Sequence, residues 1–138
     1  MNHVRRTSVV VSAAVAILLG CGGNDDPLDG KAFLLAEATG IDPLQNAPLR
    51  LEFTDGNVGI TGGCNLIGGA YELNGDILVI ETMMQTEMAC EQPRMDQDAA
   101  IIEFLQARPE IAMSGPVLTL SAEARTTMWD AVPLTKEE

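Results

Sequence analysis

Histidine is nearly absent from this chain of 138 residues, which contains one, His3. His3 falls within the first twenty residues, which have the features of a cleaved export signal, so the mature chain is expected to have no histidine. Its absence excludes Ser-His-Asp and Cys-His catalytic sites and any histidine metal site. No other set of side chains predicts a catalytic centre, a cofactor site or a metal site. We therefore predict a protein that is not an enzyme.

Basic side chains are also scarce. The chain has 8 Lys and Arg against 20 Asp and Glu, a formal net charge of −12. Removing residues 1–20 deletes Arg5 and Arg6 and leaves 6 basic residues, so the mature charge is near −14. Such a surface repels nucleic acid and anionic headgroups. Basic proteins and cationic peptides stay possible as partners, although the plainer explanation is that the charge keeps a tethered domain soluble.

A hydrophobic run of membrane-spanning length is missing too. Residues 9–19 are apolar and follow Arg5 and Arg6, but they are too short to span a bilayer, so they indicate a signal peptide over residues 1–20. Leu-Leu-Gly-Cys at 18–21 resembles the lipobox of bacterial lipoproteins. That likeness implies cleavage before Cys21 and acylation there with palmitate-type chains, which anchor firmly when several are present. In Gram-negative lipoproteins, an acidic residue directly after the lipidated cysteine favours retention in the inner membrane. Residue 22 is Gly22 rather than Asp, so the likeness implies the outer membrane, facing the periplasm, in a Gram-negative source.

Only three cysteines are present. With Cys21 lipidated, Cys64 and Cys90 remain, an even count in an oxidising compartment, and they favour a disulfide. A bridge closing a loop of ~26 residues stabilises a domain by roughly 3–4 kcal/mol in the chain-entropy model. Two alternatives stay open at this point, two buried thiols or a redox-active pair. The redox pair lacks the Cys-x-x-Cys spacing and the nearby cations that lower a thiol pKa.

A first β-hairpin is predicted around the Asp-Gly dipeptide at 55–56. Apolar and polar residues alternate on both sides of it, the pattern of half-buried strands. A two-residue loop there pairs Phe53 with Val58 and Leu51 with Ile60, which places all four side chains on one face.

A second hairpin is predicted around Asn-Gly at 74–75, the strongest short hairpin signal. A two-residue loop at these positions pairs Tyr71 with Leu78 and Gly69 with Ile80. One face of this hairpin then carries four apolar or aromatic side chains: Tyr71, Leu73, Leu78 and Ile80.

The β pattern is interrupted once, over residues 92–107, where a helix is predicted. Pro93 suits a first helical turn, and Asp96 and Asp98 favour the N-terminal end of a helix. An apolar stripe is expected at helical spacing, formed by Met95, Ala99, Ile102 and either Leu105 or Gln106. Ile101 and Phe104 widen this stripe.

Further strands are predicted at 31–37, on both sides of 114–116, and at 126–132, which holds the single tryptophan, Trp129. About eight short strands with one helix indicate a mainly β fold, an antiparallel meander that curls or closes. Residues 21–29 are rich in turn formers and are predicted to be a flexible, lipidated tether. The folded domain is predicted to comprise residues 30–134.

Gly-Gly-Cys-Asn at 62–65, Asn-Gly at 74–75 and Thr-Glu-Met-Ala-Cys at 86–90 resemble the motifs of the META domain family. The opening Gly-Lys-Ala-Phe at 30–33 differs by having Phe33 where the family often has Trp. The likeness covers about residues 29–132, and it implies a small lipocalin-like β-barrel or curled sheet with one packed helix. Members include a heat-shock-inducible lipoprotein and are linked to envelope stress, antibiotic tolerance, motility and virulence. The family defines no catalytic residues.

The functional prediction is therefore a monomeric, non-enzymatic envelope lipoprotein that acts in stress response or protection. Two alternatives are kept. One is a lipocalin-like binder of a small apolar ligand in a cavity lined by Tyr71, Leu78 or Trp129. The other is an acidic inhibitor or partner-binding module of the periplasm. A copper(I) site formed by sulfur ligands near Cys90 is less favoured, because methionines more often fill cores; the residues concerned are Met83, Met84 and Met88.

Overall fold

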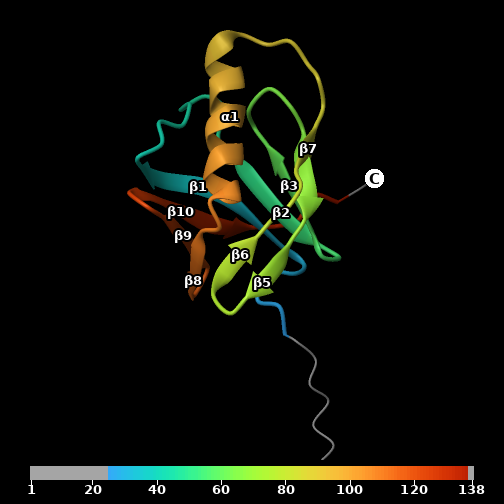
Figure 1. Ribbon diagram of the computed structural model, residues 1–138, viewed down its shortest axis with the longest axis vertical. Helices are drawn as coiled ribbons and strands as arrows, with labels where there is room; N and C mark the ends of the chain where they lie inside the picture. Colours follow the sequence, from blue (N-terminus) through green and yellow to red (C-terminus); the bar gives the residue numbers. More distant parts are fainter. Residues whose placement is uncertain (1–24, 137–138) are drawn as a thin grey trace, which may run out of the picture.

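The computed structural model describes residues 25–136, so the predicted signal peptide at 1–20 and the lipidation site Cys21 lie outside the described residues. Within 25–136 the chain forms ten strands and one helix, and the strands make one antiparallel sheet (Figure 1). In chain order the elements are β1 (Lys31–Thr39), β2 (Arg50–Thr54), β3 (Asn57–Thr61), β4 (Ile67–Ala70), β5 (Glu72–Asn74), β6 (Ile77–Val79), β7 (Met84–Gln85), α1 (Gln92–Gln106), β8 (Glu110–Ser114), β9 (Val117–Ala122) and β10 (Arg125–Val132).

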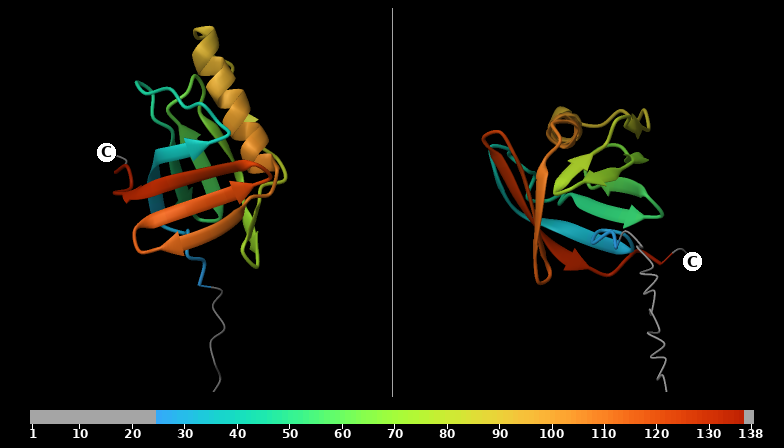
Figure 2. Two further views of the ribbon diagram at one scale, coloured as in Figure 1. Left: turned by 90° about the vertical axis from the view of Figure 1, so that its left-hand side faces the viewer. Right: turned by 60° about the horizontal axis from the view of Figure 1, so that its bottom comes forward.

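The sheet curls because two strands that are consecutive in the chain lie near its opposite ends. The strand order is β5-β6-β8-β9-β10-β1-β2-β3-β4-β7. β5 forms one edge and β4 lies beside the other, yet only Tyr71 separates them in the chain. The result is a half-barrel with the helix packed against it (Figure 2). The predicted class, a curled antiparallel sheet with one packed helix, is confirmed, with ten strands rather than about eight.

The first predicted hairpin is found with its predicted register. β2 pairs with β3 through Phe53–Val58 and Leu51–Ile60. The two loop residues, Asp55 and Gly56, have φ values of 52° and 75°. Positive φ at both positions matches the right-handed twist of the strands and explains why Asp-Gly occurs here.

The second hairpin is found, but its predicted register is wrong. Leu73 lies opposite Leu78, and Asn74 lies opposite Ile77, so the loop is Gly75-Asp76 rather than Asn74-Gly75. The shift of two residues follows from the backbone, since positive φ is adopted by Gly75 (61°) and not by Asn74. Because side chains alternate with period two, this shift leaves each side chain on its predicted face.

The C-terminal strands follow the prediction closely. β8 and β9 form a hairpin in which Ser114 pairs with Val117, and the predicted closing strand is β10. β10 pairs with both β9 and β1, so the last strand lies beside the first in the middle of the sheet. This position makes Trp129 fully buried, with 0% of its surface exposed.

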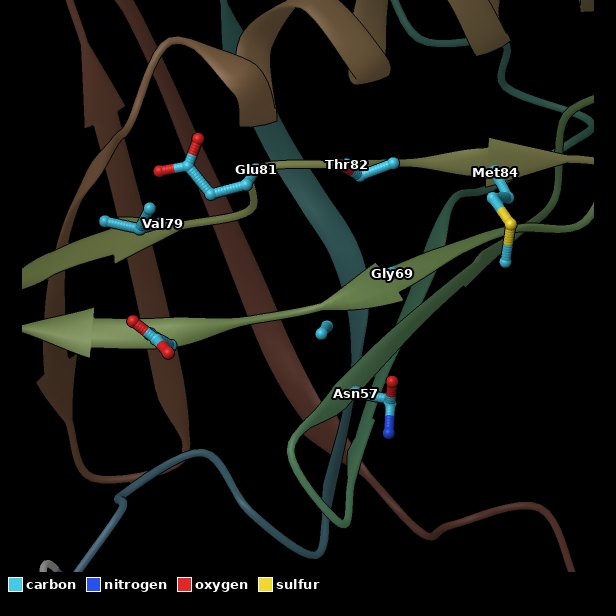
Figure 3. A pocket seen from close by; sticks show the side chains of 8 residues that line it. Asn57, Gly69, Val79, Glu81, Thr82 and Met84 are labelled. Atoms are coloured by element: carbon cyan, nitrogen blue, oxygen red, sulfur yellow. The ribbon is translucent and has the colours of Figure 1, made fainter.

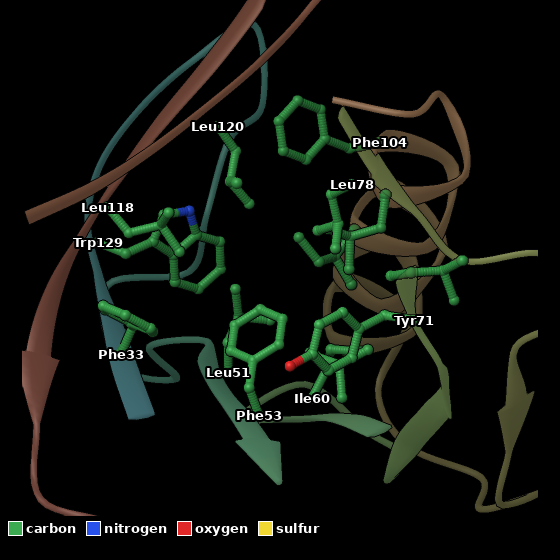
Figure 4. Close-up of a cluster of buried hydrophobic side chains, with 14 of the residues drawn as sticks. Phe33, Leu51, Phe53, Ile60, Tyr71, Leu78, Phe104, Leu118, Leu120 and Trp129 are labelled. Carbon is green, nitrogen blue, oxygen red and sulfur yellow. The ribbon is translucent and has the colours of Figure 1, made fainter. Parts of the chain in front are cut away.

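The interior of the half-barrel is filled by side chains (Figure 4). Phe53 contacts Phe33 and Tyr71 in edge-to-face geometry, with ring centroids 6.1 and 5.0 Å apart. Tyr71, Leu78 and Trp129, the expected lining of a lipocalin-like cavity, belong instead to this packed cluster. Five surface hollows over residues 25–136 are lined by other residues. The interior therefore gives no support to a small apolar ligand.

The helix α1 matches the predicted bounds, but its buried face differs from the predicted stripe. Of that stripe, Ala99 is exposed and Met95 and Ile102 are only half-buried. The buried face consists of Gln97, Asp98, Ile101, Phe104 and Leu105. Its N-terminal half is thus polar, because Gln97 and Asp98 hydrogen-bond to neighbouring loops, as described below.

The packed part of the chain begins before residue 30, the predicted start of the domain. Leu28 is 0% exposed and belongs to the core cluster. Its backbone N–H donates to Asp26 Oδ1 at 2.8 Å, and Gly30 N donates to Phe53 O at 2.8 Å. Part of the segment predicted to be a flexible tether is therefore fixed against the sheet, since Leu28 supplies core volume.

Candidate functional site

Cys64 and Cys90 form a disulfide, with an S–S distance of 2.15 Å and their Cα atoms 5.8 Å apart. The predicted bridge is therefore confirmed, and the alternatives of two buried thiols or a reduced redox pair are not what the structure contains. The bond joins the loop after β3 to the segment that enters α1. Cys64 Sγ also lies 3.3 Å from the carbonyl oxygen of Met88.

The carboxylate of Asp98 organises the loop that carries Cys64. Oδ1 and Oδ2 accept the backbone N–H of Cys64 at 3.1 and 3.2 Å. Oδ2 also accepts the backbone N–H of Asn65 at 2.7 Å and its side-chain Nδ2 at 3.1 Å. A buried carboxylate with several N–H donors is satisfied, whereas those donors without it would be buried and unpaired.

The two glycines before Cys64 are required by close contacts. A Cβ added to Gly63 would lie 1.9 Å from Asp98 Oδ1, so only glycine lets the carboxylate reach the loop. Gly62 has φ of 111°, and a Cβ there would lie 2.2 Å from the carbonyl oxygen of Pro48. The Gly-Gly part of the motif is thus explained by backbone conformation and steric exclusion.

Asn65 connects the same loop to residues 86–90. Its Oδ1 accepts the backbone N–H of Met88 at 2.7 Å and the hydroxyl of Thr86 at 3.0 Å. The Thr86 hydroxyl oxygen in turn accepts the backbone N–H of Leu66 at 3.1 Å. We call residues 62–66, residues 86–90 and Asp98 together the clasp, because hydrogen bonds and a disulfide hold the three pieces together.

Gln97 fixes a second loop to the helix. Its Oε1 accepts the backbone N–H of Leu44 at 2.6 Å, and its Nε2 donates to the carbonyl oxygen of Ala47 at 2.9 Å. Sequence reasoning missed both Gln97 and Asp98 as structural anchors and assigned Asp98 to the helix dipole. A signal was available, since residues 97 and 98 precede Ile101 and Leu105 by one or two helical turns and so share their buried face.

The methionines near Cys90 do not converge. Met84 and Met88 are 75% and 59% exposed, while Met83 is partly buried and packs against the core. Over residues 25–136, no cluster of His, Cys, Asp and Glu side chains has the arrangement of a metal site. The disulfide also removes Cys90 as a thiolate ligand, so the copper alternative has no geometric support.

Tyr71 ties the N-terminal segment to the sheet. Its hydroxyl donates to Asp26 Oδ2 at 2.5 Å. Burial raises the pKa of Tyr71, and the hydrogen bond to Asp26 and the charges of Asp26 and Asp29 raise it further. The hydroxyl therefore stays protonated as a donor, which suits an anchor rather than an acid–base catalyst.

The buried polar groups of residues 25–136 are used within the domain. Among residues 25–136, no buried side-chain nitrogen or oxygen lacks a hydrogen-bond partner. The same residues contain no helix that is both long and apolar enough to cross a bilayer. The fold and the clasp place this chain in a class of small half-barrel domains that are cross-linked by one disulfide.

The META domain model matches residues 26–132, and the chain belongs to that family. A protein from Burkholderia xenovorans, solved by NMR, has a TM-score of 0.64 and 24% identity, covering 76% of this chain and 83% of that chain. A second NMR structure has a TM-score of 0.61 and 22% identity, covering 75% of this chain and 90% of that chain. These likenesses show the fold alone. No curated protein matches the chain significantly.

Proposed function

We propose that this META-domain protein is a monomeric, non-enzymatic lipoprotein of the bacterial cell envelope. The observation that carries the non-enzymatic part is the clasp. The carboxylate of Asp98, the amide of Asn65, the hydroxyl of Thr86 and the two cysteine sulfurs all bond to other groups of the domain, so these groups are not free to act on a substrate. The most distinctive residues of the sequence therefore support the fold, and the biological role is carried by the surface.

Anchoring is proposed to occur through acyl chains on Cys21. Since Asp26 already contacts the sheet, only residues 22–25 separate Cys21 from the packed domain. At roughly 3.5 Å per residue, this linker spans no more than about 17 Å. The domain is thus expected to stay close to the headgroups, on the periplasmic face of the outer membrane in a Gram-negative source, and to act there in stress response or protection.

Metabolic labelling with an alkyne analogue of palmitate tests the anchor. The native chain is expected to take up label and to sediment with membranes, and the Cys21→Ser variant is expected to do neither. A variant with both Cys64→Ala and Cys90→Ala is the matched control, because it removes the other two cysteines and should keep the label. An unlabelled native chain, or equal label on Cys21→Ser, would refute lipidation at this residue.

Complementation tests the proposed role. A strain lacking the protein is expected to survive heat or detergent stress less well, and the native chain should restore survival while Cys21→Ser should not. Survival unchanged by the deletion would contradict a protective role.

Of the two alternatives, partner binding is favoured over an apolar ligand in the interior. The interior is filled, whereas three large apolar side chains lie exposed near one sheet edge: Leu66, Met84 and Met88. Large exposed apolar groups of this kind mark interaction sites when they are clustered.

A further inference from the structure

A row of four residues crosses the outer face of β2, β3, β4 and β7, and the two central residues of this row are glycines. Across these strands, Glu52 lies opposite Gly59, Gly59 opposite Gly68, and Gly68 opposite Met84. Their neighbours Val58, Ile60 and Ile67 point into the core, so this row faces outward. We call it the glycine trough: Gly59 and Gly68 are its floor, and Glu52 and Met84 are its ends.

Gly59 has no role in the fold that accounts for it. Its φ is not positive, and a Cβ added there would meet nothing within 4 Å. By contrast, Gly69 on β4 is required, because its Cβ would lie 2.4 Å from the carbonyl oxygen of Thr82. A glycine inside a strand weakens it and often marks a place where a ligand or another chain approaches closely. Gly59 fits that explanation.

Exposed apolar side chains border the trough. Leu66 is 56% exposed. Together with Gly68 and Met84 it lines a hollow of about 320 Å³. A second hollow, of about 340 Å³, extends over Gly59 and Gly68 toward Glu52. Figure 3 shows a third, of about 470 Å³, between the strand that carries Gly69 and the segment that carries Glu81 and Thr82. The three hollows adjoin one another, because each shares residues with another.

Acidic side chains surround these hollows. Glu52, Glu72 and Glu81 line them. Arg50 lies 2.6 Å from Glu52 and Arg108 lies 2.9 Å from Glu81, so each of these two carboxylates is paired with one cation, whereas Glu72 takes part in none of the ion pairs found over residues 25–136. The whole chain carries −12. A second copy or an anionic membrane would bring like charge to this face, whereas a cationic segment would be attracted.

We propose that the glycine trough docks an aromatic side chain flanked by Lys or Arg, presented by an extended segment of a partner protein. The ring lies flat on the floor of Gly59 and Gly68 and packs against Leu66 and Met84, and the flanking cations face Glu72 and the net negative charge of the chain. Within a single sheet, an aromatic side chain on a neighbouring strand can cover a glycine in a comparable way. The inference deepens the partner-binding alternative of the proposed function and rests on it.

Titration with short peptides tests the inference, using the full chain in an uncharged detergent and amide chemical shifts as the readout. The probes are Gly-Lys-Trp-Lys-Gly, the same peptide with Ala for Trp, and Gly-Glu-Trp-Glu-Gly. The first is expected to shift the amides of Gly59, Leu66, Gly68 and Met84. The other two should bind at least about tenfold more weakly, a factor that corresponds to ~1.4 kcal/mol. Affinity should also fall between low and high salt.

Gly59→Thr is the decisive variant, because it fills the floor at a position with free space and a strand-forming residue. It is expected to bind the Trp peptide at least about tenfold more weakly while remaining folded. Ala112→Thr on β8 is the matched control, adding a β-branched side chain to an exposed strand position elsewhere, and its affinity should stay within about twofold. If Gly59→Thr does not fold, Met84→Ser provides the same test, with an expected loss of about three- to tenfold.

Unchanged affinity in Gly59→Thr, equal binding of the Ala peptide, or shifts that map elsewhere would overturn the proposal. Concentration-dependent self-association that shifts the trough amides without peptide would assign this face to a second copy and also overturn it. Binding of the trough to uncharged vesicles would assign it to lipid, with the same consequence. Because these measurements do not depend on acylation of Cys21, failure of the labelling experiment leaves them interpretable, and the reverse also holds.

Discussion

The clasp is formed by two loop segments and one helix residue, and the glycine trough by β2, β3, β4 and β7. Both depend on glycine, but for opposite reasons. In the clasp, a Cβ on Gly62 or Gly63 would collide with Pro48 or Asp98. In the trough, a Cβ on Gly59 would meet nothing. The clasp is closed by internal contacts, so its glycines, Asn65 and Asp98 are explained by stability. At Gly59 the trough leaves space that no internal contact accounts for, whereas a Cβ on Gly68 would lie 3.3 Å from the carbonyl oxygen of Val58. We therefore interpret the clasp as holding the fold together and the trough as a surface for a partner.

Removing the carboxylate at the centre of the clasp should have the largest effect on stability. Asp98→Ala leaves the N–H groups of Cys64 and Asn65 without their acceptor. We expect the free energy of unfolding to fall by about 3–5 kcal/mol. Urea denaturation followed by far-UV circular dichroism measures it. Asp96→Ala is the control on the same helix, since Asp96 is exposed and the change should stay within about 0.5 kcal/mol. Equal losses in the two variants would show that Asp98 is not the organising group.

Opening the disulfide should be the next largest effect. The double variant Cys64→Ala and Cys90→Ala is expected to lose roughly 3–4 kcal/mol, because the unfolded chain regains the freedom of a ~26-residue loop. Chemical denaturation with and without dithiothreitol checks this. Reductant should destabilise the native chain and leave the double variant unchanged. A reductant effect of similar size on the double variant would contradict this explanation.

One pair of substitutions compares the two regions directly. Gly62→Ala should destabilise by about 2 kcal/mol or more, because φ of 111° is strained for alanine and the Cβ overlaps Pro48. Gly59→Ala should stabilise by about 0.5–1 kcal/mol, since alanine suits a strand interior better than glycine and has room. Thermal melts of both variants give the comparison. A loss of stability in Gly59→Ala would mean that this glycine serves the fold after all, and the argument for the trough would fail.

The sequence predicted well those features that local patterns determine. The first hairpin's register, the helix bounds, the last hairpin and the disulfide all follow from alternation, turn dipeptides and cysteine count. The register at 74–76 was wrong because Asn-Gly and Gly-Asp are both acceptable two-residue loops, and the choice depends on how β6 meets β8 through Ile77 and Glu110.

The contacts of Asp98, Gln97 and Leu28 required tertiary information. Asp98 bonds to a loop 33 and 34 residues earlier in the chain, and Gln97 to residues 50 and 53 earlier. No periodicity encodes such a pairing. The glycine trough also required tertiary information, because Gly59 and Gly68 become neighbours only when β3 and β4 pair. Within the sequence, Gly59 is merely a glycine in a strand.

The smallest predicted effect concerns Glu52, at one end of the trough. Burial tends to raise the pKa of Glu52, but hydrogen bonds from Thr135 and Arg50 outweigh it and hold the pKa below its usual value of 4.5. A carboxyl group with a lowered folded pKa stabilises the fold above the unfolded pKa, and this stabilisation is lost as pH falls through the folded value. Since Glu52 and Arg50 are partly exposed, we expect less than about 1 kcal/mol.

Unfolding of the native chain and of Glu52→Gln at pH 7 and at pH 3 measures this contribution. The variant should be less stable than the native chain at pH 7, and the difference should shrink as the pH falls toward 3 and the native carboxyl group begins to take up a proton. Glu72→Gln is the matched control, because Glu72 is exposed and accepts no side-chain hydrogen bond among residues 25–136. A difference for Glu52→Gln that persists unchanged at pH 3 would mean that the charge of Glu52 does not account for its contribution to stability.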